Sequence, residues 1–318
     1  MVRFVFFLLL LPIPLLPAQE TVPQAVKLIE ARNFDDARDM LGRIVERNDT
    51  DGEAHFQLGR ILFEHFHDLD AAEEHLERAL ELADGRADYH FMLGRVYGAI
   101  AQDGGVFTGM KYAGKVKSEF LRAVELDPDN RDYRTGLMRY YYRAPAMVGG
   151  GVSKAREQAG AILRLDAYEG HLAFAEIATH EKNFQEAETE YKAAIAASPA
   201  KPLAYFRLGY VYLGQKRIDE SISEFRKYVK YAPDDPNSHD SLGEALLERG
   251  NIDEALHSYR KAFALNSRFP SSLYGMALCY DRKGAKAEAL EYYQKFLSLD
   301  PGGKSAETAQ KRVEELKD

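Results

Sequence analysis

Apolar residues recur along most of the chain at the i, i+3, i+4 and i+7 spacing that gives an α-helix one buried face. The segments with this spacing come in pairs, and short stretches containing Gly, Pro or Asn separate them. In the last third of the chain the pattern returns with a fixed period. A small residue stands every 34 positions in four successive segments: Ala187, Ser221, Ala255 and Ala289. The pattern therefore predicts an all-α protein built from repeated helix pairs.

Three further columns of matched residues keep this period. An aromatic residue follows each small residue by four positions: Tyr191, Phe225, Tyr259 and Tyr293. A proline, or once a serine, follows eight positions later: Pro199, Pro233, Ser267 and Pro301. A glycine or alanine precedes each small residue by twelve positions: Ala175, Gly209, Gly243 and Ala277. We call this last column the Gly slot, and we expect it to let the two helices of a pair approach closely. The proline cannot continue a helix and marks the turn to the next pair.

A 34-residue period with these columns resembles the tetratricopeptide repeat (TPR). The resemblance rests on a short motif around the Gly slot that recurs along the chain: Leu58-Gly59-x-x-Leu62, Leu93-Gly94-x-x-Tyr97, Leu137-Met138-x-x-Tyr141, Leu208-Gly209-x-x-Tyr212, Leu242-Gly243-x-x-Leu246 and Met276-Ala277-x-x-Tyr280. It implies a right-handed α-solenoid of about eight TPR-like repeats over residues 19–303, whose first helices line a concave groove. Residues 304–318 then form a polar capping helix with four apolar residues on one face: Ala306, Ala309, Val313 and Leu316.

Two insertions interrupt the period. The interval from Gly94 to Met138 is 44 residues and that from Met138 to Ala175 is 37 residues, against a period of 34. The surplus falls near 102–110 and 144–152, where Gly and Pro predict loops between the two helices of a repeat. Such loops either carry function or are tolerated spacers, and both interpretations stay open.

The first 18 residues differ from the rest of the chain. Arg3 precedes an unbroken apolar run from Phe4 to Leu11, and small Ala18 stands before Gln19. This order is typical of a secretory signal peptide, here residues 1–18. The alternative is a retained anchor, but the run is far shorter than the roughly 20 residues that span a bilayer. No Cys stands near the cleavage point, and no later segment is apolar enough to cross a membrane. We expect an exported protein, periplasmic or secreted, without a stable membrane span.

Composition and motifs argue against several functions. A net charge of −8 does not favour nucleic acid as a partner, because phosphate binding requires a basic face. The single Cys, Cys279, allows neither a disulfide framework nor a zinc site built from cysteines. The sequence contains no nucleophile, phosphate-loop or metalloprotease motif, and the repeats occupy the whole mature chain. We therefore expect a protein that is not an enzyme and uses no cofactor.

Five of the nine histidines fall between positions 55 and 90: His55, His65, His67, His75 and His90. A metal site needs several converging ligands, and His65, His67 and His75 with a nearby Asp form one candidate set. Residues two apart do not share a face of a helix, however, and surface histidines are common at turns. We expect no metal site.

The residue after the Gly slot is expected to face the groove. In three successive repeats it is an arginine, namely Arg60, Arg95 and Arg139, and in a later repeat it is Tyr210. The candidate binding residues are these four and three neighbouring aromatics: Phe56, Phe91 and Tyr142. Arg suits an acidic peptide because its planar fork forms paired hydrogen bonds with a carboxylate. The alternative is internal pairing, with Asp88 reaching Arg60 and Asp132 reaching Arg95 across neighbouring repeats.

The TPR proteins that clamp a terminal carboxylate use a Lys and an Asn on the first helix. The equivalent pairs here are Phe56 with Arg60, Phe91 with Arg95 and Asp240 with Glu244, so this role is not expected. The sequence predicts instead a scaffold that binds a protein or an extended, acidic peptide in its groove outside the cytoplasm. The alternative is an assembly factor for envelope, secretion or polysaccharide-export machinery that uses its loops and convex face.

Overall fold

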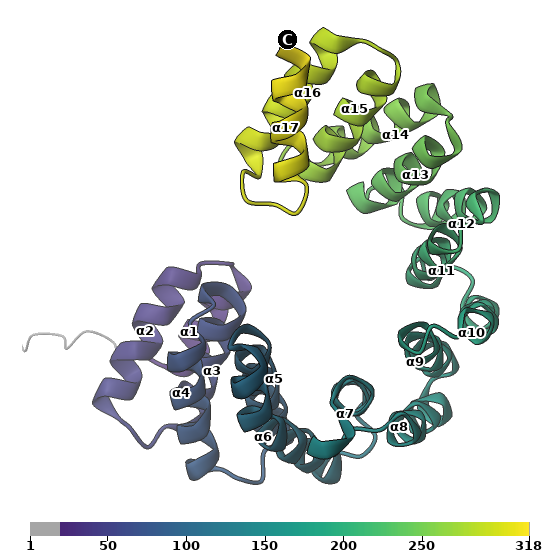
Figure 1. The fold of residues 1–318 in the computed structure, drawn as a ribbon. Coiled ribbons are helices and arrows are strands. Elements are labelled where there is room, and N and C mark those ends of the chain that lie inside the picture. The colour runs from purple at the N-terminus through teal and green to yellow at the C-terminus, as the bar shows by residue number, and fades with distance from the viewer. Residues whose placement is uncertain (1–19, 318) are drawn as a thin grey trace, which may run out of the picture. The chain divides into compact units, whose positions relative to one another are not determined.

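A computed structural model describes residues 20–317 of the chain, so the expected signal peptide lies outside the described residues. The described part contains seventeen α-helices and two short helices of other types, and it falls into two compact units (Figure 1). Unit 1 ends at Pro128 and unit 2 begins at Asp129. The all-α solenoid expected from the sequence is confirmed in both units.

Unit 1 contains six α-helices and one π-helical turn: α1 (Val22–Glu30), α2 (Phe34–Arg47), α3 (Gly52–Ile61), η1 (Leu62–Phe66), α4 (Leu69–Leu82), α5 (Ala87–Asp103) and α6 (Gly105–Leu126). Consecutive helices pack against each other in pairs. The Asp51 and Asp68 side chains cap α3 and α4 by accepting hydrogen bonds from Ala54 N and Ala71 N.

Unit 2 contains eleven α-helices and one 3₁₀ turn: α7 (Arg131–Arg143), η2 (Ala146–Val148), α8 (Val152–Leu165), α9 (Ala167–His180), α10 (Phe184–Ala197), α11 (Leu203–Gly214), α12 (Ile218–Tyr231), α13 (Pro236–Arg249), α14 (Ile252–Leu265), α15 (Pro270–Arg282), α16 (Lys286–Leu299) and α17 (Ala306–Lys317). The proline column marks the ends of the second helices, since Pro233 and Pro301 begin the turns that follow α12 and α16.

The first helix of each pair lies on the inner side of unit 2. Contacts join α7 to α9, α11 to α13 and α13 to α15, whereas the second helices make their main contacts with first helices. In a curved stack, the first helices of consecutive pairs can contact one another only if they lie along the shorter, inner arc. Figure 1 shows α9 and α11 on the inner side of unit 2, with α8 and α10 on its outer side. We call the surface of α7, α9, α11, α13 and α15 the inner face of unit 2.

The Gly slot holds the two helices of a pair in close contact. A Cβ atom at Gly209 would lie 2.5 Å from the Phe225 ring, and one at Gly243 would lie 2.9 Å from the Tyr259 ring. Real Cβ atoms essentially never show contacts this short, so alanine at either position would force the ring or the helix to shift. Phe225 and Tyr259 belong to the aromatic column and are buried. The close approach expected from the sequence is therefore confirmed, and the aromatic ring fills the space that the missing side chain leaves.

The C-terminal cap also forms as expected. Helix α17 packs on α16, and its four apolar residues are all buried: Ala306, Ala309, Val313 and Leu316. The remaining faces of α17 are polar, and the side chain of Arg312 donates hydrogen bonds to both carboxylate oxygens of Asp281 on α15, at 2.6 and 2.7 Å. A polar outer face is what ends a stack of repeats without exposing its core.

The first insertion is not a loop, so that prediction is wrong. Helix α5 continues through Asp103, and α6 begins at Gly105, which leaves Gly104 alone between them. The ten extra residues lengthen both helices. Gly105 supplies the sharp reversal with a φ of 72°, in the left-handed region that glycine adopts readily. The second insertion is a turn as predicted, in which η2 is held by the Tyr140 hydroxyl donating to Val148 O at 2.5 Å.

None of the helices within residues 20–317 is both long and apolar enough to cross a membrane.

Candidate binding surface

The inner face of unit 2 is built by the residues that follow the Gly slot. The slot residue faces the second helix of its own pair, and its successor is rotated about 100° around the helix, toward the neighbouring first helix. Arg139, Tyr210 and Glu244 occupy this position on α7, α11 and α13. Arg139 and Tyr210 each form a hydrogen bond with the next first helix along the stack. Their placement on the inner face therefore agrees with the sequence analysis.

Arg139 is held by an ion pair within unit 2. Its Nε and Nη2 atoms donate to the two carboxylate oxygens of Glu176 on α9, at 2.9 and 3.0 Å. The Tyr142 hydroxyl donates to the same carboxylate at 2.7 Å. Burial raises the pKa of Glu176, but the hydrogen bonds and charge of Arg139 outweigh it and leave that pKa below its usual value. The arginine that was expected to hold a partner's carboxylate thus holds an internal one.

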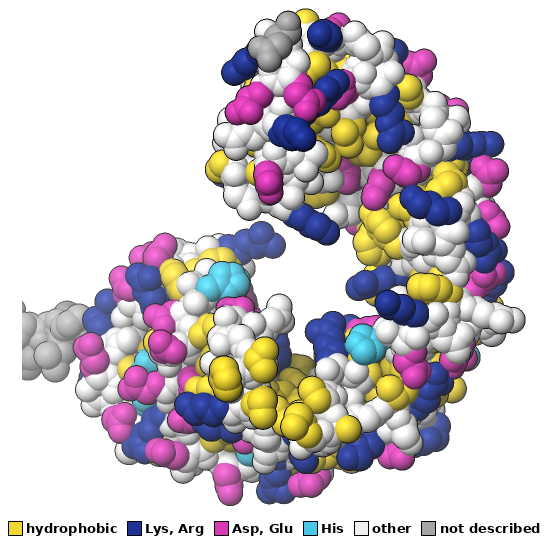
Figure 2. Space-filling view, in the orientation of Figure 1, with side chains coloured by type: hydrophobic (Ala, Val, Ile, Leu, Met, Phe, Trp, Pro, Cys, Tyr) yellow, Lys and Arg dark blue, Asp and Glu magenta, His cyan; other side chains and the backbone are white. Residues whose placement is uncertain are grey.

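The next part of the inner face carries an aromatic ring and a second cation. Tyr210 is 37% exposed, and its hydroxyl donates to Glu244 at 2.9 Å. Arg207, one turn earlier on α11, is exposed, and its charge also lowers the pKa of Glu176. Figure 2 shows hydrophobic and basic side chains next to one another on the inner side of unit 2. Arg207 was not among the predicted site residues because it precedes the Gly slot by two positions, a column that shows no repeated charge.

A carboxyl group lies buried further along the inner face. Asp240 on α13 is 8% exposed and accepts hydrogen bonds from the hydroxyls of Ser271 at 2.7 Å and Ser272 at 3.2 Å, both on α15. Burial raises its pKa to about 6, and the neighbouring charge of Glu244 adds to this effect. The basic groups of α7 and α11 are therefore followed by an acidic pair on α13.

In unit 1 the predicted residues are mainly part of the core. Phe56 is buried and stacks on Tyr89 with ring centroids 4.4 Å apart. Phe91 is partly buried, and its ring lies 5.6 Å from that of Phe120. The Nε atom of Arg60 is buried and has no hydrogen-bond partner among residues 20–317. Tyr142 in unit 2 is buried as well. The aromatics next to the slot serve packing, which periodicity alone does not distinguish from binding.

Internal pairing occurs, but with other partners than expected. Arg95 donates to Glu64 of η1 at 2.8 Å and lies over the Phe63 ring at 5.1 Å. Asp88 pairs with Arg86, which directly precedes α5, at 2.7 Å. The expected pair of Asp88 with Arg60 is therefore wrong, and Arg95 has its partner within unit 1. Which charged groups meet depends on local turns such as η1, and the repeat period does not predict these turns.

Other exposed apolar residues lie at the end of the long hairpin in unit 1. Val106 and Phe107 in the first turn of α6 are 77% and 88% exposed, and Met110 one turn later is 51% exposed. Met147 in the second insertion is 79% exposed. Side chains of this size are seldom so exposed in adjacent positions. The sequence analysis marked both segments as insertions, but their exposure follows only from the packing.

The comparisons with known proteins agree with this architecture. Two family models described as tetratricopeptide repeat match the chain, one at residues 172–236 and 241–304 and the other at residues 28–96. No curated protein matches it.

Among solved structures, the chain is similar to one in the "Crystal structure of APC/C hetero-tetramer Cut9-Hcn1", with a TM-score of 0.54 and 15% identity. The match covers 90% of this chain and 53% of that chain, so this chain spans about half the length of the solved one. At this identity the likeness concerns the fold alone. The family models cover repeats in both units, and the helix pairs and Gly slots of the structure have the same period. This chain belongs to the tetratricopeptide repeat family.

Proposed function

We propose that the chain is a non-catalytic scaffold that binds an extended segment of a partner protein on the inner face of unit 2. One observation carries the proposal. Along the first helices of this unit, exposed charged and aromatic side chains follow one another from Arg139 through Arg207 and Tyr210 to Glu244. Arg139 and Tyr210 also join neighbouring first helices, but all four groups remain exposed, and an extended peptide offers backbone and side chains of both charges to them.

The internal ion pair of Arg139 is compatible with binding an acidic partner. Its side chain is 47% exposed and that of Glu176 is 31% exposed, so the pair contributes roughly 0–1 kcal/mol to stability. A partner carboxylate can replace Glu176 at the arginine without a large loss. The partner's backbone or hydroxyl groups can then use Tyr210.

The binding proposal is tested by crosslinking followed by affinity measurements on two variants. A photo-crosslinking amino acid at Tyr210 is expected to capture the partner in the native cells, whereas the same group at Ala287, exposed on the second helix α16, is not. With that partner in hand, Arg139→Ala is expected to weaken binding about tenfold, because a charge-assisted hydrogen bond is lost. The loss should be smaller at high salt.

Glu176→Gln is the matched variant. It removes the competing internal carboxylate and leaves Arg139 in place, so an acidic partner is expected to bind more tightly. Unchanged affinity in both variants would mean that Arg139 and Glu176 serve only the packing of α7 on α9. Equal capture from Tyr210 and Ala287 would contradict binding on the inner face.

A second candidate function rests on the apolar end of the α5–α6 hairpin. Val106, Phe107 and Met110 form an exposed knob that suits an assembly factor, which would insert them into a partner of larger machinery. The same crosslinking group at Phe107 distinguishes the two functions. Capture from Phe107 with none from Tyr210 would favour the assembly role over binding on the inner face.

We also propose that the protein acts outside the cytoplasm, in the periplasm or after secretion. This proposal is supported by the charged start, short apolar run and small residue of positions 1–18, which lie outside the described residues. N-terminal sequencing of the mature protein from its native cells is expected to begin at Gln19. A mature chain that still carries residues 1–18 would contradict cleavage.

A further inference from the structure

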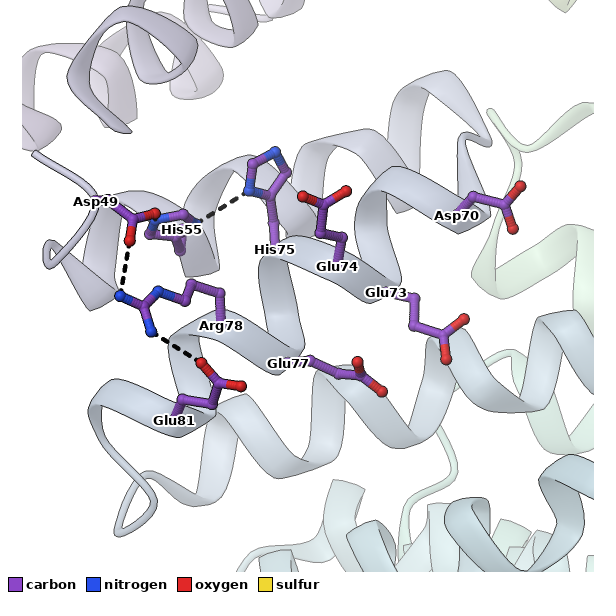
Figure 3. A pocket seen from close by; sticks show the side chains of 9 residues that line it. All are labelled: Asp49, His55, Asp70, Glu73, Glu74, His75, Glu77, Arg78 and Glu81. Atoms are coloured by element: carbon purple, nitrogen blue, oxygen red, sulfur yellow. Dashed lines mark hydrogen bonds and ion pairs between the residues drawn. The ribbon is translucent and has the colours of Figure 1, made fainter. Parts of the chain in front are cut away.

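Two histidines that are twenty positions apart in sequence meet between α3 and α4 in unit 1. The Nδ1 atoms of His55 on α3 and His75 on α4 lie 3.0 Å apart (Figure 3). Each imidazole brings one ring nitrogen to the same point, and both side chains line a pocket of about 530 Å³. His55 is 4% exposed, and His75 is partly exposed. No part of the proposed binding function uses this pocket.

The separation of the two nitrogens matches that of two ligands on one metal ion. Bonds of 2.0–2.1 Å at angles between square-planar and tetrahedral geometry place two nitrogens about 2.8–3.4 Å apart. Imidazole nitrogen is a preferred ligand of Zn²⁺, Cu²⁺ and Ni²⁺. The observed 3.0 Å lies within that interval. An ion that binds both lone pairs would replace the single hydrogen bond that the rings now share.

The other nitrogen of His55 is placed as in known metal sites. Its Nε2 atom is buried, makes no hydrogen bond among residues 20–317, and lies 3.3 Å from a carboxylate oxygen of Asp49. Arg78 in turn fixes Asp49 by donating to its other oxygen at 2.7 Å. At 3.3 Å the charge of the Asp49 carboxylate favours a proton on this outer nitrogen, and that tautomer leaves the inner nitrogen free to bind a metal.

The pocket is lined by more acidic side chains than basic ones, since Arg78 is the single basic residue among its lining residues. Glu74 and Asp70 on α4 form no hydrogen bond or ion pair within the described part of the chain, and both line the pocket. Figure 3 shows the Glu74 carboxylate beside the His75 ring. Within residues 20–317 no three His, Cys, Asp or Glu side chains converge on one point. An ion held by the two imidazoles would therefore take its remaining ligands from water in the open pocket.

From this geometry we propose that His55 and His75 bind a divalent transition-metal ion of the zinc, copper and nickel class, with Asp49 orienting His55. The site joins α3 to α4 within one repeat, so a bound ion would also stabilise unit 1. A site with two protein ligands and a water-filled remainder exchanges its metal readily, unlike a closed structural zinc site.

The test is calorimetric titration of the untagged protein with ZnCl₂. We expect saturable binding of one ion, and we expect His75→Gln to weaken it at least tenfold. His257→Gln, which changes an exposed histidine on α14 of unit 2, should leave the affinity unchanged. Asp49→Asn keeps both imidazoles and should weaken binding several-fold, because the orienting carboxylate is lost. Because His55 is buried, His55→Gln could disturb the fold. This variant is used only if its circular dichroism spectrum shows the same helix content as the wild type.

A second measurement identifies the ligands directly. With Cu²⁺ in place of Zn²⁺, the electron paramagnetic resonance spectrum is expected to show coupling to two imidazole nitrogens in the wild type and to one in His75→Gln. Absence of saturable binding, or equal binding by wild type and His75→Gln, would show that the two rings only share a hydrogen bond. Equal loss in His257→Gln would point to nonspecific binding at surface histidines.

Discussion

Replacing Gly170 by alanine is expected to destabilise unit 2 by about 3 kcal/mol, the upper part of the range for overpacking a tight contact. Gly170 lies in the first turn of α9, where a Cβ atom would come within 2.2 Å of the Leu163 Cα atom on α8. The obstacle is backbone, which cannot rotate away as a side chain can. The two helices must therefore move apart, and the packing between them is lost.

Gly160→Ala is the matched control in the same helix pair. The nearest atom to a Cβ there is Phe174 Cζ at 4.0 Å, an ordinary contact, and Gly160 lies in the interior of α8. Alanine should raise stability by roughly 0.5–1 kcal/mol, because glycine loses more backbone entropy in a helix. Urea unfolding followed by circular dichroism measures both variants. Opposite shifts of the midpoint are expected, and equal shifts would contradict the close contact at Gly170.

Asp240→Asn is expected to raise stability at pH 7, by about 2 kcal/mol. Burial raises the pKa of the Asp240 carboxyl to about 6 in the folded protein, against about 3.9 in an unfolded chain. The folded state therefore binds the proton more tightly, and stability falls as the pH rises from about 4 to about 6. Above about pH 6 the Asp240 carboxyl is ionised in both states, and its burial lowers the stability of the folded protein by the full amount. An amide keeps the polar contacts, because its oxygen accepts from one serine and its nitrogen donates to the other.

The pH dependence separates this effect from a change in packing. Urea midpoints at pH 7 should favour Asp240→Asn over wild type. Most of this advantage should be lost near pH 4, where the wild-type carboxyl is protonated in the folded state and about half protonated in the unfolded chain. Glu288→Gln, in the first turn of α16, is the control, because its carboxyl is exposed and is not among the groups that shift the pKa of Asp240. An advantage of Asp240→Asn that is equal at both pH values would show that the raised pKa is not its cause.

The Gly slot shows how far local pattern reaches into the tertiary structure. Its 34-residue spacing predicted the helix pairs and their close contact at Gly209 and Gly243, whereas the structure showed that the aromatic ring fills each contact. These contacts form between residues of the same repeat. Each repeat therefore carries the same residue pattern, which can be recognised in the sequence. The same reasoning placed the polar cap α17, since a stack must end on a helix with one apolar face.

For the candidate site, the sequence predicted the positions of some residues on the inner face. It did not predict which of them are paired or buried. The position after the slot correctly placed Arg139 and Tyr210 at the inner face. Whether an arginine there is free depends on a carboxylate in another repeat, and Glu176 lies 37 positions from Arg139. Burial likewise separates Phe56, which packs on Tyr89, from Tyr210, which is partly exposed. A column of similar residues carries no information about which neighbour each one meets.

The position of the first insertion was predictable from the sequence, but its structure was not. Its glycines predicted a loop, yet Gly104 and Gly105 suffice for the reversal, and the remaining residues extend two helices that pack on each other. By itself, the sequence determined the repeat, the class of fold and the faces that are buried, because these follow from periodic contacts of short range. Only the tertiary structure decided which charges are paired, that Asp240 is buried, and that His55 meets His75. Those outcomes depend on single contacts between helices, which no period encodes.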